Sequence, residues 1–459
     1  MNTDGTDKGE SFTEALRTGS IRKLVTWAVG DSGDLQTQMI QGTGGTFILR
    51  VTSAGLGFVT SLVLARVLGA ESYGSYAYAL SWVSILVIPA MMGGPQLLTR
   101  EISQYKSKQN WSALRGILRR SDQAVLAVSL GISLVGVLVT EFLGEGLDPQ
   151  TQTALRVAAL LLPPFAFVRI RQSSLRGLGH VVKAQLPQKL ILPVLFLALV
   201  GLGYFYGSLS APVAVGMRAL AAGVALLVTS ILLRRYLPDR YSEASYEFNT
   251  SEWLRSALPL LLIAGANVVN QRVSVIMLGS MVGSEAAGIF DAARRGVGLV
   301  AFSLAAVNMP LAPTIAQLYS EGKMERMQQV VTKSARVALF GSLPVGMGLI
   351  LLREPFLLLY GEDFTSGTLV LIILCIGQLS NAGLGSVVQI MNMTGHEGYV
   401  ALVLTTAAGL NIILNFVLIP IWGLEGAGMA TAGSTMFWNV LSCILIRSKI
   451  GINSTIVGR

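Results

Sequence analysis

Apolar and polar positions alternate along this chain in long blocks rather than in the short periods of a soluble fold. Each apolar block is close to the ~20 residues that an α-helix needs to cross a bilayer, and the polar stretches between the blocks are short. The blocks lie near residues 46–66, 73–96, 123–143, 151–172, 187–206, 211–233, 257–281, 288–311, 334–352, 368–392, 399–419 and 426–446. This pattern predicts an all-α, polytopic membrane protein with twelve transmembrane helices.

Composition agrees with that prediction, and the distribution of charge orients the helices. The 459 residues are 52% hydrophobic and 13% charged, whereas a soluble domain has roughly 25% charged residues. Of the 34 Lys and Arg residues, 26 lie in the segment 1–45 or in and beside the stretches that follow the second, fourth, sixth, eighth and twelfth blocks. Because cytoplasmic loops are enriched in these residues, we expect both termini in the cytoplasm. The net charge of +9 is then a topology signal and does not indicate a nucleic-acid surface.

The two halves of the chain resemble each other. The motif G-[AS]-E-x-x-G-x-[YF]-x-x-A occurs at 69–79 and again at 283–293, and six blocks lie in each half. An even number of spans gives the repeats the same orientation, related by an axis along the membrane normal, as in transporters that work by alternating access. We predict a V-shaped pair of pseudo-symmetric six-helix lobes. The predicted parts are a cytoplasmic tail (1–45), an N-lobe (46–233), a cytoplasmic linker (234–256), a C-lobe (257–446) and a second cytoplasmic tail (447–459).

Motifs for catalysis or cofactor binding are not expected in this chain. The sequence contains no GxxxxGK[ST] phosphate loop for ATP, and the segment 234–256 is too short for a soluble catalytic domain. Cys375 and Cys443 lie within apolar blocks and share no metal-ligand spacing. The prediction is therefore a transporter without catalytic residues, ATP, metal or cofactor.

The eight basic residues outside the cytoplasmic stretches are all arginines, and Arg272 is the most deeply placed. It lies fifteen residues into its block, about 22 Å along a helix, where an arginine costs on the order of 3 kcal/mol. A guanidinium can bind phosphate through two parallel hydrogen bonds, which suits it better than lysine to this role. We therefore expect a wet cavity between the lobes for an anionic, phosphate-bearing cargo.

Several other polar residues are expected in the same cavity, and for some of them a second interpretation remains open. We expect Asn267, Asn270 and Ser274 to share the helical face of Arg272. The further candidate arginines are Arg50, Arg156, Arg218 and Arg294. Arg156 and Arg218 could instead extend to the outer membrane interface, and Arg294 could instead pair with Asp291 at i,i+3. Asp291 is also the candidate carboxylate for ion coupling.

Short motifs in both halves resemble those of a known family. Residues 411–420 read N-x-x-L-N-x-x-L-I-P and are followed by Gly423, Gly426-Ala427 and Ala430-Thr431. Together with Leu64-Ala65-Arg66-Val67-Leu68-Gly69, this pattern resembles polysaccharide (O-antigen) flippases of the multidrug/oligosaccharidyl-lipid/polysaccharide exporter (MOP) superfamily. The chain departs from the family at Ser274, where an acidic residue is common, and at Phe290, where tyrosine is common.

The resemblance implies a cargo and a location. The cargo would be an oligosaccharide repeat unit on a polyprenyl pyrophosphate, moved from the inner to the outer leaflet of the cytoplasmic (inner or plasma) membrane for surface polysaccharide assembly. Membrane lipids, a polysaccharide polymerase and chain-length proteins would be its partners, with no nucleic acid. Two alternatives remain open: a cation-coupled multidrug exporter of the same superfamily, and a membrane-embedded sugar transferase or ligase.

Overall fold

The computed structural model describes residues 35–142, 146–207 and 209–458, and within those ranges it contains helices and no strand. The predicted all-α class is therefore confirmed. Of the predicted tail 1–45, residues 1–34 lie outside the described residues, and the remainder belongs to the first described helix.

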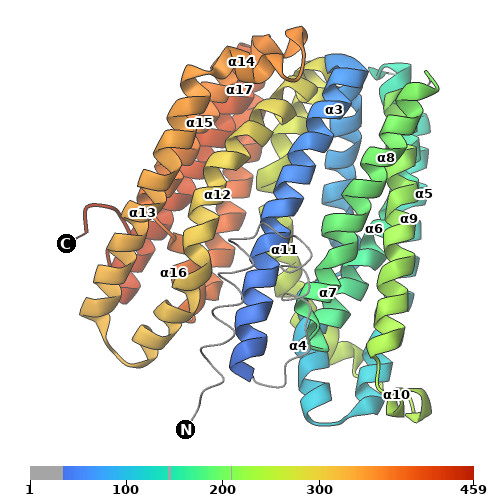
Figure 1. Cartoon of the computed structure of the whole chain (residues 1–459), viewed down its shortest axis with the longest axis vertical. Helices are drawn as coiled ribbons and strands as arrows, with labels where there is room; N and C mark the ends of the chain where they lie inside the picture. Colours follow the sequence, from blue (N-terminus) through green and yellow to red (C-terminus); the bar gives the residue numbers. More distant parts are fainter. Residues whose placement is uncertain (1–34, 143–145, 208, 459) are drawn as a thin grey trace, which may run out of the picture.

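The helices of the two halves lie on different sides of the molecule. Figure 1 shows α5 to α9 on one side, the helices from α12 to α17 on the other, and α3 between them. The first half contains α3 (Leu35–Met91), α4 (Gly94–Ser107), α5 (Trp111–Phe142), α6 (Pro149–Gly177), α7 (Val181–Leu186), the π-helical turn η2 (Pro187–Ile191), α8 (Leu192–Phe205) and α9 (Ala211–Tyr236). After the short α10 (Arg240–Glu243), the second half contains α11 (Thr250–Met281), α12 (Ser284–Ser320), α13 (Met324–Leu351), α14 (Arg353–Leu358), the 3-10 turn η3 (Glu362–Gly367), α15 (Thr368–Leu384), α16 (Val387–Met393) and α17 (Glu397–Ile450).

Ten helical segments of the described chain are long and apolar enough to cross a membrane, so the chain is a multi-pass membrane protein. Two of them, Gly45–Met91 with 47 residues and Glu397–Ile450 with 54, would extend roughly 70 and 80 Å if straight, more than twice a bilayer core of about 30 Å. Each contains one residue with non-helical angles, Gly69 (φ 74°) and Gly423 (φ 53°). Each also spans two of the predicted blocks, so ten segments and twelve blocks describe the same sequence; the count of twelve stays a prediction.

The repeated motif contributes a close backbone contact between the two halves. Gly74 on α3 and Gly288 on α12 hold the same position in the two copies of the motif, and they pack against each other. A Cβ on Gly74 would lie 1.7 Å from the carbonyl oxygen of Ser284, and one on Gly288 would lie 2.6 Å from that of Ala70. Both distances are far below van der Waals contact, so these two positions require glycine, which lets membrane helices approach closely.

The segment that joins the halves packs on the first one. Arg115 on α5 donates hydrogen bonds to the carbonyl oxygens of Ser242 and Ala244, and Trp253 donates its indole N–H to the Tyr105 hydroxyl at 3.0 Å. The predicted linker 234–256 contains the end of α9, all of α10 and the start of α11. Its assignment as a cytoplasmic linker stays a prediction.

Candidate functional site

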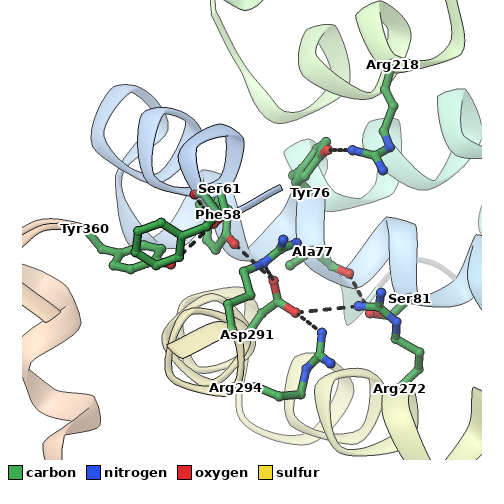
Figure 2. Close-up of polar contacts among 12 residues, drawn as sticks. Phe58, Ser61, Tyr76, Ala77, Ser81, Arg218, Arg272, Asp291, Arg294 and Tyr360 are labelled. Atoms are coloured by element: carbon green, nitrogen blue, oxygen red, sulfur yellow. Dashed lines mark hydrogen bonds and ion pairs between the residues drawn. The ribbon is translucent and has the colours of Figure 1, made fainter. Parts of the chain in front are cut away.

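Asp291 on α12 is the centre of a cluster of arginines between the halves. Its side chain is 1% exposed, and both carboxylate oxygens accept hydrogen bonds. Oδ1 accepts from Arg294 Nη2 at 2.7 Å and lies 3.6 Å from Arg272 Nη1; Oδ2 accepts from Arg295 Nε at 2.6 Å and from the Tyr73 hydroxyl at 3.0 Å. Figure 2 shows the side chains of Arg272 and Arg294 pointing toward this carboxylate. The predicted pairing of Arg294 with Asp291 is confirmed.

Three guanidinium groups share one carboxylate in this cluster, so positive charge is in excess. Each guanidinium carries five N–H donors, and Asp291 accepts from only a few of the donors present. The side chains of Arg272, Arg294 and Arg295 remain 26%, 24% and 29% exposed. Their remaining donors are therefore available to an anion.

A cavity of about 360 Å³, called here the first cavity, brings together the basic side chains of both halves. It is bounded mainly by α3, η2, α8 and α9, and Arg272, Asp291 and Arg295 reach it from the second half. Four basic residues line it against one carboxylate; they are Lys189, Arg218, Arg272 and Arg295. Such a charge balance favours an anionic ligand.

Arg218 is held at this cavity by aromatic side chains. Its Nη1 donates to the Tyr76 hydroxyl at 2.8 Å (Figure 2), and its guanidinium carbon lies 5.3 Å from the centroid of the Phe196 ring. A cation over an aromatic face is favourable, and neither contact neutralises the charge. The alternative in which Arg218 extends to the membrane interface is not what the structure shows.

A second cavity, of about 380 Å³, lies within the second half between α11, α12, α15 and α17. Three of the predicted site residues line it: Asn267, Asn270 and Arg294. The predicted site residues that line a cavity are therefore divided between the two cavities. On α11, Gln271 lines the second cavity and the adjacent Arg272 lines the first. On α12, Arg294 lines the second cavity and the adjacent Arg295 lines the first. These two helices thus form the wall between the cavities.

The prediction that Asn267, Asn270 and Ser274 share a face with Arg272 is wrong. Successive residues of an α-helix are rotated by about 100°, so positions 267, 270 and 274 share a face, and position 272 lies roughly 140–200° away from each of them. Asn270 donates to the Leu404 carbonyl at 3.1 Å. Ser274 is buried with its hydroxyl 2.8 Å from that of Thr431, and it lines neither cavity.

Two further predicted arginines lie outside both cavities. Arg50 is an exposed residue on α3, one helical turn before Ser53, which lines the first cavity. Arg156 Nη2 forms an ion pair with Glu141 Oε2 at 2.8 Å, and both side chains are more than a third exposed. Its charge is therefore already paired away from the first cavity, and Arg156 is not part of the site proposed below.

Sequence reasoning missed Lys189 as a residue of the first cavity. Arg295, which also lines this cavity, is one of the eight arginines outside the cytoplasmic stretches but was not among the candidate site residues. Lys189 lies beside a predicted cytoplasmic stretch, but the π-helical turn η2 that carries it packs against α3 and α9 and contributes to the wall of the cavity. The available signal was the pair of prolines, Pro187 and Pro193, because proline interrupts helical hydrogen bonding and favours such irregular turns.

A third cavity has different chemistry. It measures about 470 Å³, lies between α3, α5 and α6, and has no charged side chain among its lining residues. An anionic group would lose its hydration there without gaining a partner. The cavity with the basic excess is therefore the candidate site, although it is smaller.

Comparison with known proteins agrees with the fold. The family described as "Polysaccharide biosynthesis protein" matches residues 39–319, and the MatE family matches 259–417. The probable flippase AglR of Haloferax volcanii is 25% identical, over 86% of this chain and 81% of its own. The succinoglycan biosynthesis transport protein ExoT of Rhizobium meliloti is 26% identical, over 70% of this chain and 62% of its own.

A solved structure of the lipid II flippase MurJ in an inward closed conformation superposes with a TM-score of 0.69 at 15% identity, over 87% of each chain. At that identity the likeness shows the fold alone. The first family covers more than half of this chain, from the first apolar block into α12. The chain therefore belongs to the polysaccharide biosynthesis protein family, and it is a membrane transporter of the flippase type within the MOP superfamily.

Proposed function

We propose that this protein moves a polyprenyl-pyrophosphate-linked oligosaccharide from the inner to the outer leaflet, with the pyrophosphate held by the arginines of the first cavity. One observation carries the proposal: four basic side chains face one carboxylate in a cavity between membrane-spanning helices. The flippase names of the relatives and the family match support the same class of cargo.

Basic residues within membrane-spanning helices require an energetic reason. An arginine at this depth costs on the order of 3 kcal/mol, and Asp291 offsets only part of the charge of its three neighbours. An arriving pyrophosphate supplies the missing negative charge and accepts the unused guanidinium N–H groups. Outward movement of each net negative charge down an inside-negative potential releases about 2.3 kcal/mol per 100 mV, so the field can favour the anionic headgroup.

The contacts between the halves support an alternating-access mechanism. Arg66 on α3 donates from Nε and Nη2 to the carbonyl oxygens of Leu359 and Leu358, at 2.6 and 2.8 Å. Nearby, the hydroxyls of Ser61 and Tyr360 lie 3.3 Å apart. By the positive-inside rule this end of the molecule faces outward. With this orientation the contacts would close the outer side, and the first cavity would release cargo only after they separate.

A multidrug exporter of cationic compounds is the alternative, and the MatE match covers part of the chain. The sign of the charge argues against it. A cationic drug would enter a cavity with a basic excess, where like charges repel it, and Asp291 has both oxygens occupied by arginines and Tyr73.

The proposal can be tested by deletion and complementation in the source organism. We expect deletion to abolish the surface glycan and to leave lipid-linked intermediates on the inner leaflet. The wild-type gene and the Arg156→Ala variant should restore the glycan, because Arg156 is paired with Glu141 outside the cavities. Arg272→Ala at normal protein level should not. Intact surface glycan together with drug sensitivity in the deletion strain would favour the exporter instead.

A further inference from the structure

The second cavity contains side chains that the arginine cluster leaves without a role. Asn267, Gln271, Gln378, Asn381 and Trp438 all line it, each with its polar atoms free of hydrogen bonds to any residue in the described part of the chain. Asn270 differs from them, because its amide is already bonded to two backbone carbonyls.

The free groups define the chemistry of a ligand. Four carboxamides present both donors and acceptors, which is the pattern needed to bind hydroxyl groups, because each hydroxyl both donates and accepts. Trp438 adds an apolar ring surface with a polar N–H, on which the apolar face of a sugar ring can pack. A cavity of about 380 Å³ falls within the range of small-molecule sites. These features fit a neutral saccharide.

A metal ion or a cationic ligand fits the second cavity poorly. No carboxylate lines it, and its only charged lining residue is Arg294, which is held by Asp291 in the cluster of Figure 2. A cation there would meet a like charge and only neutral amide oxygens. The cavity is therefore polar, weakly positive and free to form hydrogen bonds.

The two cavities are separated by one layer of helix and joined by one ionic cluster. Gln271 faces the second cavity and the adjacent Arg272 faces the first; Arg294 and Arg295 divide in the same way, and all three arginines contact Asp291. A cargo with an anionic group and a saccharide attached to it would therefore meet matching chemistry on the two sides of a single wall.

We propose that the second cavity binds the saccharide part of the cargo and sets sugar preference, through the carboxamides of Asn267, Gln271, Gln378 and Asn381 and the ring of Trp438. This inference rests on the proposed function, because the first cavity must hold the pyrophosphate of the same molecule. It assigns selectivity to the second half and anchoring of the charged group to the first cavity.

The test compares two probes on the purified full-length protein in proteoliposomes: bare polyprenyl pyrophosphate, and the same lipid carrying a neutral disaccharide. The quantity measured is the ratio of the two affinities. For the double variant Gln378→Leu, Asn381→Leu we expect the preference for the saccharide-bearing lipid to fall about tenfold, since the hydroxyls lose their partners. Arg272→Ala should weaken both probes together. Gln104→Ala, which removes an exposed carboxamide on α4, is the matched control and should keep the wild-type ratio.

The outcomes separate the two proposals. An unchanged ratio in the double variant, while wild-type protein binds both probes, would overturn the saccharide site and leave the proposed function intact. If the wild-type protein binds neither probe, the proposed function is contradicted, and the saccharide site with it. If the double variant does not fold, Asn267→Ala and Gln271→Ala provide the same comparison from another helix.

Discussion

Asp291 is the counter-ion of an arginine cluster. A carboxylate that couples transport to protons or sodium must release its partners and become accessible. Asp291 is 1% exposed, with Arg294, Arg295 and Tyr73 bonded to it. We therefore propose a structural role for it in place of the ion-coupling role considered from sequence.

Replacing Asp291 by Asn should destabilise the protein. The substitution leaves three partly buried guanidinium groups without their shared negative charge, and breaking a buried ion pair in this way costs about 3 kcal/mol or more. The free energy of unfolding in detergent, from denaturant titration, measures the effect. Glu141→Gln is the control, because it breaks the exposed pair with Arg156 and should cost less than about 1 kcal/mol. Equal losses in the two variants would contradict the assignment.

Part of the candidate site could be predicted from the length of the apolar blocks. The part that depends on helix rotation and on contacts between helices could not. Arg272 could be predicted because an arginine fifteen residues into an apolar block has no exit to water. The grouping with Asn267 and Asn270 failed because these residues are close to Arg272 in sequence but lie on a different face of the same helix. The partner of Arg156, Glu141, comes from another helix, and no spacing rule connects the two.

Between helices, the repeated motif accounts for the close contact of α3 with α12, which composition alone does not predict. The motif predicted two related halves, and the structure adds the physical reason for its glycines: positions 74 and 288 let α3 and α12 touch through their backbones. Helix boundaries were predicted less well. The block at 368–392 is divided into α15 and α16 at Gly385, whose φ of 83° ends a helix in a way that hydropathy does not register.

Alanine at position 288 should therefore disrupt the junction of the halves. A Cβ there would clash with the backbone of α3, and overpacking of this kind typically costs 1–3 kcal/mol. Gly298→Ala on the same helix is the control, because nothing lies within 4 Å of its Cβ position; it should leave stability unchanged or slightly raised. Thermal unfolding midpoints in detergent compare the two, and a Gly298→Ala loss as large as that of Gly288→Ala would contradict the role of the close contact.

At the scale of the whole molecule, the halves are joined at the end that we assign to the outer side. Arg66 contributes two hydrogen bonds to carbonyls at the end of α14, and alternating access requires them to break. Their loss should shift the population toward an outward-open state. The contact links residues that are 292 and 293 positions apart in the chain. No short sequence pattern could therefore reveal it.

The Arg66→Ala variant should widen the distance between the halves at that end. Spin labels on the exposed residues Thr153 and Asp363 allow this distance distribution to be measured in nanodiscs. We expect a larger fraction of long distances than in the unsubstituted protein. Arg353→Ala is the control, because its hydrogen bond is to Ile350 within its own half. An unchanged distribution in Arg66→Ala would show that this contact does not hold the closed state.

Transport by the purified protein can be measured in proteoliposomes with a fluorescent polyprenyl-pyrophosphoryl oligosaccharide and a membrane-impermeant quencher. We expect protein-dependent movement of the label between leaflets without ATP, unchanged in Arg156→Ala and reduced at least tenfold in well-folded Arg272→Ala. Transport by Arg272→Ala at the wild-type rate would contradict the claim that the arginines of the first cavity carry the pyrophosphate.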